Sequence, residues 1–233
     1  MSNKTTAVAI DGPAGAGKST IARTLAETMG FIYVDTGALY RTVAYSVARN
    51  GIDPADTDAV TAHLEKISVD IKYKDNEQRV LLNGEDVSDR IRTPEVSMTA
   101  SKTSAIPEVR AFLLELQRKL AAENNVVMDG RDIATVVLPD AKVKIFLTAS
   151  PEVRARRRYD ELVAKGAGVR FEDVLSDLIK RDEQDMNRRV APLKPSADAV
   201  IVDTSELDLK ASVEAMRRVV EENLEREHQT WER

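Results

Sequence analysis

The sequence predicts an α/β fold in which a five-stranded parallel sheet carries helices on both faces, with one inserted antiparallel element. Three observations predict it. Short apolar runs alternate with segments of helical period, a glycine-rich octet follows the first run, and alternating apolar and polar residues interrupt this order near residues 68–87. Strands that alternate with helices form parallel sheets with right-handed crossovers, and their ligands bind at the carboxyl ends of the strands.

The first strand and helix enclose the most specific motif. Residues 7–10 form an apolar run suited to a buried strand, and residues 12–19 then read Gly-Pro-Ala-Gly-Ala-Gly-Lys-Ser, which fits G-x-x-x-x-G-K-[ST]. Apolar residues recur at helical spacing from Ile21 until Gly30. The turn's backbone N–H groups can wrap a phosphate, Lys18 would reach the β- and γ-phosphates, and Ser19 would ligate Mg²⁺. An ordinary glycine-rich turn is the alternative, but both flanks favour phosphate binding.

The remaining elements follow in order. After a strand at 31–34 we expect a helix from about Leu39 to Arg49, then an antiparallel hairpin between residues 68 and 87 with its turn near Asp75-Asn76. Further along, we expect a long helix opened by Pro107, strands at 126–128, 143–147 and 200–203, and a terminal amphipathic helix over about 209–226.

Three charged residues directly follow the strand at 126–128, in the sequence Asp129-Gly130-Arg131-Asp132. An acid directly after an apolar strand of such a protein commonly lies near the metal or orients a phosphate-binding arginine. The alternative is that Asp129 caps the next helix.

Two segments are rich in arginine. The helix expected after residue 150 begins with four arginines: Arg154, Arg156, Arg157 and Arg158. It ends at two glycines, Gly166 and Gly168. Consecutive arginines at a helix start oppose the helix dipole, which favours an anion bound against them. The flanking glycines suit a segment that hinges over a nucleotide. The alternative is a solvated basic face paired with Asp160 and Glu161.

The second segment spans residues 171–189. Its residues Val174, Leu178, Arg181, Asp185 and Arg188 share one helical face, which begins apolar and becomes charged. Guanidinium groups are preferred partners of phosphate oxygens, and an interleaved carboxylate can fix their geometry or hold a ribose hydroxyl. A salt-bridge ladder within the helix is the alternative. Further arginines, expected at strand or loop ends, are Arg41, Arg110 and Arg131. This number of arginines is more than a single nucleotide site needs, and it suits a protein that binds two phosphate-bearing substrates.

Composition limits the protein's class. A chain of 233 residues can bury a substantial core, and we expect a single domain. A net charge of −5 opposes binding to nucleic acid or anionic membranes, and the absence of cysteine excludes disulfides and thiolate metal sites. The amino-terminal residues carry no apolar run, and no segment reaches membrane-spanning length. We therefore expect a cytoplasmic monomer that binds neither nucleic acid nor membranes.

Over nearly its whole length the chain resembles bacterial cytidylate kinases, which are P-loop nucleoside monophosphate kinases. The matching stretches lie at residues 10–13, 35–41, 85–88, 91–97, 129–132, 144–147, 181–182 and 190–193. The hairpin near 68–87 is similar to the element that separates this family from adenylate kinases. The resemblance implies a kinase core at about 1–62, 102–150 and 190–233, a nucleoside-monophosphate-binding region at about 63–101, and a lid at about 151–170.

The resemblance also implies the role of each site residue. ATP would be bound by Gly12, Pro13, Ala14, Gly15, Ala16, Gly17, Lys18, Ser19 and Thr20, with Arg154, Arg157 and Arg158 as lid residues over its phosphates. Arg41, Arg131 and Arg181 would clamp the acceptor monophosphate, supported by Asp129 and Arg188. Thr36, Tyr40 and Asp185 would contact its ribose and phosphate, and Ser101, Arg110 and Asp132 its cytosine. Catalysis would rest on Lys18, Arg131, Arg157, Arg158 and Arg181.

The implied reaction is transfer of the γ-phosphate of ATP, with Mg²⁺, to CMP or dCMP. Some relatives have serine at position 36 and glycine at position 19; Thr36 keeps the hydroxyl, and Ser19 follows the general motif. A regulatory GTPase is a competing class, but its N-K-x-D and D-x-x-G patterns do not occur in the sequence. A P-loop kinase for another small acceptor, such as UMP, is the remaining alternative.

Overall fold

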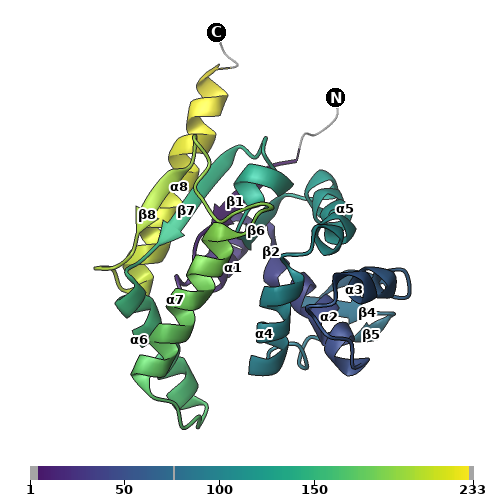
Figure 1. Ribbon diagram of the computed structural model, residues 1–233. Helices are drawn as coiled ribbons and strands as arrows, with labels where there is room; N and C mark the ends of the chain where they lie inside the picture. Colours follow the sequence, from purple (N-terminus) through teal and green to yellow (C-terminus); the bar gives the residue numbers. More distant parts are fainter. Residues whose placement is uncertain (1–4, 76, 231–233) are drawn as a thin grey trace. The chain divides into compact units, whose positions relative to one another are not determined.

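A five-stranded parallel sheet forms the centre of the fold. In the computed structural model, which describes residues 5–75 and 77–230 and the side chains up to residue 225, its order is β2-β6-β1-β7-β8 (Figure 1). The strands are β1 (Ala7–Asp11), β2 (Ile32–Asp35), β6 (Val126–Gly130), β7 (Val143–Thr148) and β8 (Val200–Asp203). Strand β1 pairs in parallel with β6 and β7, and β7 pairs in parallel with β8. The predicted parallel sheet is confirmed.

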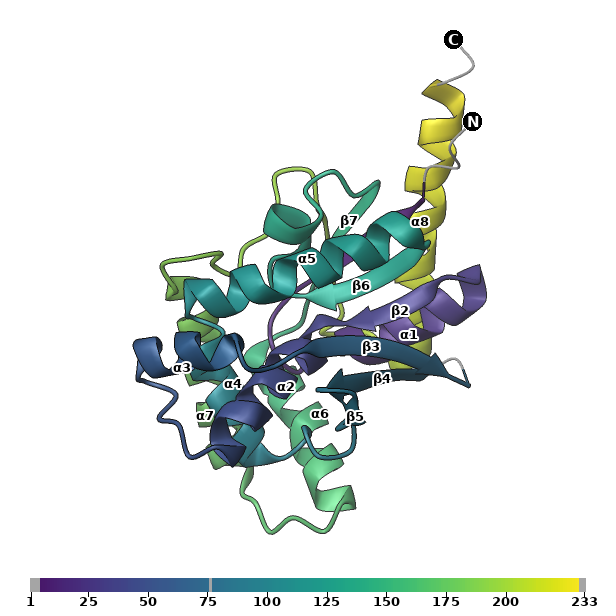
Figure 2. The ribbon, with the colours of Figure 1, turned by 90° about the vertical axis from the view of Figure 1, so that its right-hand side faces the viewer.

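The chain divides into two compact units, one formed by Met1–Tyr33 and Asn124–Arg233 and the other by Val34–Glu123. The first unit carries α1 (Lys18–Met29), the π-helical turn η1 (Ile133–Val137), α6 (Pro151–Ala164), α7 (Phe171–Asn187) and α8 (Leu209–Thr230). The second carries α2 (Thr36–Arg49), α3 (Thr57–Leu64), α4 (Pro94–Thr103) and α5 (Pro107–Glu123). It also holds a separate antiparallel sheet, β3 (Val69–Lys74), β4 (Glu77–Leu82) and β5 (Glu85–Asp86), seen in dark blue in Figure 2.

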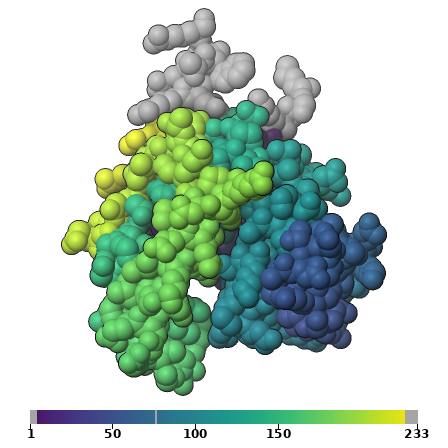
Figure 3. All heavy atoms as spheres, in the orientation of Figure 1, coloured from purple at the N-terminus to yellow at the C-terminus, as the bar shows by residue number. Residues whose placement is uncertain are grey.

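The first unit's core lies between the sheet and two helices. Val8, Ala9 and Ile10 of β1 have no exposed surface, which explains why this central strand reads as an unbroken apolar run. Ile21 and Leu25 of α1 are buried in the same apolar cluster as residues of β7, β8 and α8. Helices α6 and α7, green in Figures 1 and 3, pack against each other and lie at the surface. The sheet and α1 therefore give the loop between them a rigid base.

The second unit corrects several expectations. Helix α2 begins at Thr36, three residues before the expected start at Leu39, because the Asp35 carboxylate accepts a hydrogen bond from Ala38 N at 2.9 Å and caps the helix. The expected hairpin is confirmed, with β5 as a third strand. Helices α3 and α4 were not predicted, although the Thr93 hydroxyl caps α4 and proline opens it. Their buried faces are short, which leaves little periodicity to detect.

The predicted regions of the chain stay predictions. The nucleotide-binding region expected at about 63–101 lies within the second unit, which spans 34–123. The assignment of residues 151–170 as a lid stays a prediction; they include α6 and the turn after it, where Gly166 has a φ of 80°. Within the part of the chain that the structure describes, no helix combines the length and apolar character needed to cross a membrane.

Candidate active site

The glycine-rich loop joins β1 to α1 and is packed tightly against its neighbours. Gly12 has a φ of 151°, and a Cβ there would lie 1.9 Å from the carbonyl oxygen of Leu147 in β7. A Cβ on Gly15 would lie 3.2 Å from atoms of Arg154 and Leu178. Gly12 therefore excludes a larger residue for steric reasons, whereas at Gly15, with a φ of 73°, the backbone conformation disfavours one and the packing is tight. The loop is held between β7, α6 and α7.

Lys18 is the charged centre of this loop. Its side chain is 6% exposed, and its Nζ donates a hydrogen bond to the carbonyl oxygen of Pro13 at 2.7 Å. Burial, followed by the positive charge of Arg131, lowers the pKa of Lys18 to about 7. At the start of α1, Gly17 offers no side chain to satisfy the first N–H groups. A positive helix end and a desolvated ammonium therefore point at the same loop, which is an arrangement suited to an anion.

Asp129 lies beside this loop, at the end of β6. Its two carboxylate oxygens accept hydrogen bonds from Ser19 Oγ and Tyr33 Oη, each at 3.0 Å. Asp129 lies within the strand, so the alternative that it caps the next helix is wrong. Tyr33 was not predicted, because an apolar strand position gives no sign of a hydroxyl contact to a residue 96 positions away. The result is a hydroxyl and a carboxylate held together at the start of α1.

Asp11, another residue that sequence reasoning missed, orders the backbone after β6. Its carboxylate accepts hydrogen bonds from Ile133 N and Ala134 N, both at 2.8 Å, at the start of η1. Burial raises the pKa of Asp11 to about 6. Asp11 directly precedes the glycine-rich loop, and η1 directly follows Asp132. The contact between them therefore links the loop that holds Lys18 to the charged residues 129–132.

A second charged cluster joins the end of β6 to α7. Arg131 Nε donates to Asp185 Oδ2 at 2.9 Å, and Arg188 Nη1 lies 3.8 Å from Asp185 Oδ1. Arg188 also lies 3.5 Å from Asp132 Oδ1. Despite burial, which favours the neutral acid, the charges of Arg131, Arg181 and Arg188 lower the pKa of Asp185.

The salt-bridge ladder does not describe this cluster, because the nearest partner of Asp185 comes from another element, Arg131. Arg188 lies just after α7 rather than within it, so the shared helical face ends at Asp185. Arg181 remains on the helix. Its charge lowers the pKa of both Lys18 and Asp185, which places it within electrostatic reach of the loop and the cluster.

The three arginines of α6 that were predicted as lid residues have different surroundings. Arg154 is 4% exposed, and its guanidinium is engaged by the loop and by Asp182 of α7. Arg157 donates to the carbonyl oxygens of Thr204 at 2.8 Å and Leu207 at 3.3 Å. Arg158 is exposed and pairs with Glu161 at 2.7 Å. The alternative of a solvated, salt-bridged face therefore describes Arg158 alone among these three.

The other predicted contact residues lie in the second unit. Arg41 Nη2 donates to Asp35 Oδ2 at 2.9 Å, and Arg92 Nη2 donates to the same oxygen at 3.3 Å. These guanidinium groups lower the pKa of Asp35 although burial opposes them. Arg110 is 8% exposed and lies 5.5 Å from the centre of the Tyr40 ring.

Arg41 and Arg110 lie within α2 and α5, so the expectation that they stand at strand or loop ends is wrong. Thr36 opens α2, and Ser101 lies in α4. Arg41, Arg110, Thr36, Tyr40 and Ser101 thus belong to the second unit, and the other predicted acceptor contacts to the first. Asp35 and Arg92 were not predicted as site residues.

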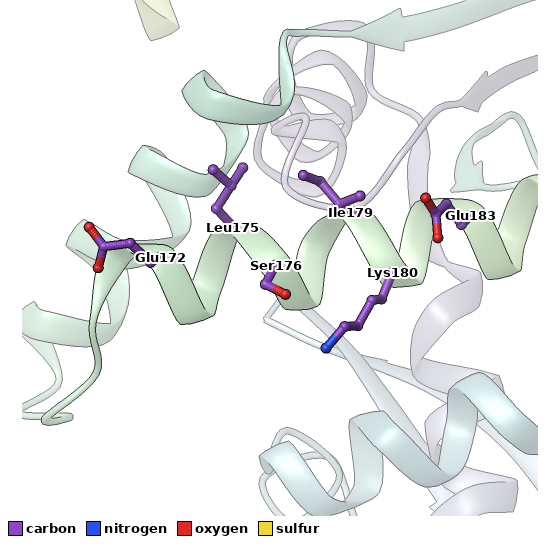
Figure 4. Close-up of a pocket in the computed structure, with 6 residues that line it drawn as sticks. All are labelled: Glu172, Leu175, Ser176, Ile179, Lys180 and Glu183. Carbon is purple, nitrogen blue, oxygen red and sulfur yellow. The ribbon is translucent and has the colours of Figure 1, made fainter.

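One open depression, of about 390 Å³, lies along α7, and its lining residues are not members of these clusters. All of its lining residues come from that helix, and Figure 4 shows Leu175 and Ile179 projecting from it one turn apart. None of the lining residues was predicted to bind a substrate.

A parallel sheet, a phosphate-binding loop after its first strand and a buried arginine–carboxylate cluster define a P-loop kinase. One solved structure, of an uncharacterized protein from Eubacterium ventriosum, has this fold with a TM-score of 0.54 at 14% identity, covering 94% of this chain and 99% of that one. The family model described as cytidylate kinase matches residues 8–222. The chain belongs to the cytidylate kinase family.

Curated relatives agree over almost the full length. A cytidylate kinase of Carboxydothermus hydrogenoformans is 51% identical over 213 residues, which cover 91% of this chain and 96% of the relative. A cytidylate kinase of Caldanaerobacter subterraneus is 48% identical over 223 residues, or 96% of this chain and 98% of the relative.

Proposed function

We propose that this protein transfers the γ-phosphate of ATP to CMP and dCMP, giving ADP and CDP or dCDP. The observation that carries the proposal is the pairing, within one unit, of a phosphate-binding loop around Lys18 with the arginine cluster at Arg131 and Asp185. Transfer between two anionic nucleotides requires that donor and acceptor be held in line while their charge is neutralised. Lys18 neutralises the donor phosphates, and Arg131, Arg181 and Arg188 neutralise the acceptor phosphate.

Ser19 and Asp129 fit a magnesium ion bound together with ATP. The hydroxyl and the carboxylate lie 3.0 Å apart beside the loop, and both are oxygen ligands of the kind that Mg²⁺ prefers. Among the described residues, no group of three acidic, histidine or cysteine side chains could hold a metal ion by itself. This agrees with an ion held largely by phosphates and water. When bound, Mg²⁺ would neutralise charge on the phosphates, while Tyr33 keeps the Asp129 carboxylate oriented.

The acceptor roles follow from the family resemblance and are given for each unit by itself. In the first unit, Arg131 and Arg181 would bind a monophosphate, Asp185 would contact ribose and phosphate, and Asp132 would read cytosine. In the second unit, Arg41 is the predicted monophosphate ligand, Thr36 and Tyr40 the ribose and phosphate contacts, and Ser101 and Arg110 the base contacts. Cytosine presents an N4 amino donor where uracil presents an O4 acceptor, and a carboxylate can only accept. Asp132, which is 4% exposed, therefore favours cytosine and repels uracil.

The proposal is tested by measuring kcat/KM for CMP, dCMP, UMP and AMP at one ATP concentration. We expect the two cytidine nucleotides to be preferred. A preference for UMP would instead support the alternative, a kinase for another acceptor.

Asp132→Asn is expected to lower kcat/KM for CMP more than for UMP, because the amide adds a donor and removes the charge. The CMP:UMP ratio should fall by about tenfold or more, which corresponds to about 1.4 kcal/mol of discrimination. Asp140→Asn, at an exposed position outside the site, serves as the control. If both substrates are slowed equally, Asp132 supports Arg188 and does not read the base.

Nucleotide binding is expected to take up a proton at pH 8. The pKa of Lys18 is about 7 in the free protein, and an adjacent phosphate raises it. Between the two pKa values the free amine is neutral and the bound one charged, so affinity falls as the pH rises above 7. Calorimetric titration with MgADP in buffers of different ionisation enthalpy measures this uptake. Equal uptake by Lys18→Ala would assign the proton to another group.

A further inference from the structure

Arg154 binds three acceptors that come from three different elements. Its Nε donates to the carbonyl oxygen of Ala149, after β7, at 2.8 Å. Its Nη1 donates to the carbonyl oxygen of Ala14, in the glycine-rich loop, at 3.0 Å and to Asp182 Oδ2 in α7. Both members of the ion pair are buried, at 4% exposure for Arg154 and 6% for Asp182. The rigid fork of a guanidinium suits such fixed directions, which a lysine ammonium cannot reproduce.

The hydrogen bond from Arg154 to the carbonyl oxygen of Ala14 helps to fix the backbone of the glycine-rich loop. A loop that points its N–H groups inward toward a phosphate must direct carbonyl groups elsewhere, and a buried carbonyl needs a donor. Lys18 supplies a donor to Pro13, and Arg154 supplies one to Ala14. Arg154 also packs closely against Gly15 of the loop, since a Cβ added to Gly15 would lie 3.2 Å from the Cβ of Arg154. This packing supports the loop in addition to the hydrogen bond to Ala14.

Asp182 fixes the direction of Arg154. Its Oδ2 accepts from Arg154, while its buried Oδ1 accepts no hydrogen bond from any described residue. Asp182 is also the neighbour of Arg181 in α7. The pair thus connects the loop to the two helices that carry the predicted phosphate-binding arginines.

We infer that Arg154 and Asp182 are positioning residues that hold the glycine-rich loop in the form that accepts a nucleotide, and that Arg154 acts through the loop rather than on the donor phosphates. This differs from the expectation that Arg154 is a lid residue over those phosphates. The inference concerns the donor side of the proposed kinase and rests on that function only for the identity of the nucleotide.

Asp182→Asn distinguishes an effect of charge alone from positioning of the loop, because the two predict opposite changes in nucleotide affinity. By charge alone, removing a carboxylate near a phosphate site strengthens the binding of an anion. If Asp182 positions the loop through Arg154, the same change weakens binding. Calorimetric titration of the full chain with MgADP is therefore expected to show about a fivefold higher Kd for Asp182→Asn and at least tenfold for Arg154→Met. The combined variant should bind no more weakly than Arg154→Met, because both changes break one contact.

An exposed ion pair in the same unit provides the matched control. Arg217 and Glu214 of α8 pair at 2.8 Å with side chains that are 40% and 42% exposed, so Arg217→Met and Glu214→Gln should leave the Kd unchanged. Should Arg154→Met fail to fold, as judged by circular dichroism, Arg154→Lys retains the charge and is still expected to weaken MgADP binding. An unchanged or lower Kd for Asp182→Asn overturns the inference, as does a parental Kd for Arg154→Lys. Phosphorylation of CMP by the parent protein tests the proposed function separately.

Discussion

Lys18→Ala is expected to lower the turnover number for CMP phosphorylation by about two to three orders of magnitude while the protein remains folded. A preorganised cation in a buried site stabilises transition-state charge strongly, and loss of one such donor typically costs about two to three orders of magnitude. Lys18 is such a group, because it is 6% exposed and its Nζ is held 2.7 Å from the carbonyl oxygen of Pro13. Burial already opposes its charge, so its removal does not threaten the core.

Steady-state kinetics with saturating ATP and CMP measure this effect, with circular dichroism to verify the fold. Lys210→Ala, at an exposed position of α8, is the matched control and should keep the parental turnover. Near-parental turnover of Lys18→Ala would show that the loop is not the donor site.

Arg131→Lys is expected to lower kcat/KM for CMP by about a hundredfold, or roughly 2.7 kcal/mol, although the positive charge is kept. The guanidinium donates through Nε to Asp185 at 2.9 Å and through Nη1 to the carbonyl oxygen of Gly130 at 3.2 Å. An ammonium group cannot make both contacts and also present a fork to a phosphate. Because Arg131 is assigned to the acceptor, the KM for ATP should change less than threefold.

Arg217→Lys tests whether any arginine replacement is harmful. Arg217 lies in α8 and forms surface ion pairs with Glu214 and Glu221, far from the predicted contacts in sequence, so its replacement should leave kinetics unchanged. If Arg131→Lys behaves like the parent, charge alone suffices and the geometry of the cluster is unimportant.

The family and the sheet could be predicted because their signals are local. The strand at 7–11, the glycine-rich loop and the helix after it are neighbours in sequence, and each has its own periodicity or turn chemistry. The hairpin at 69–82 was found by its alternation for the same reason. In contrast, α3 and α4 were not predicted because their buried stripes are short. The predicted start of α2 was three residues late because Asp35 was not recognised as the cap of the helix.

Residue types and their order along the chain by themselves determined the parallel sheet, the loop that binds phosphate and the presence of more arginines than one nucleotide needs. Only the tertiary structure decided which partners each arginine has and how deeply it is buried. Arg154 and Arg158 stand four residues apart on one helix, yet one is buried against the loop and the other is exposed. Tyr33 and Asp129 meet only because β2 and β6 are neighbours in the sheet. Burial and hydrogen-bond partners depend on contacts between residues distant in sequence, and such contacts leave no local pattern to read.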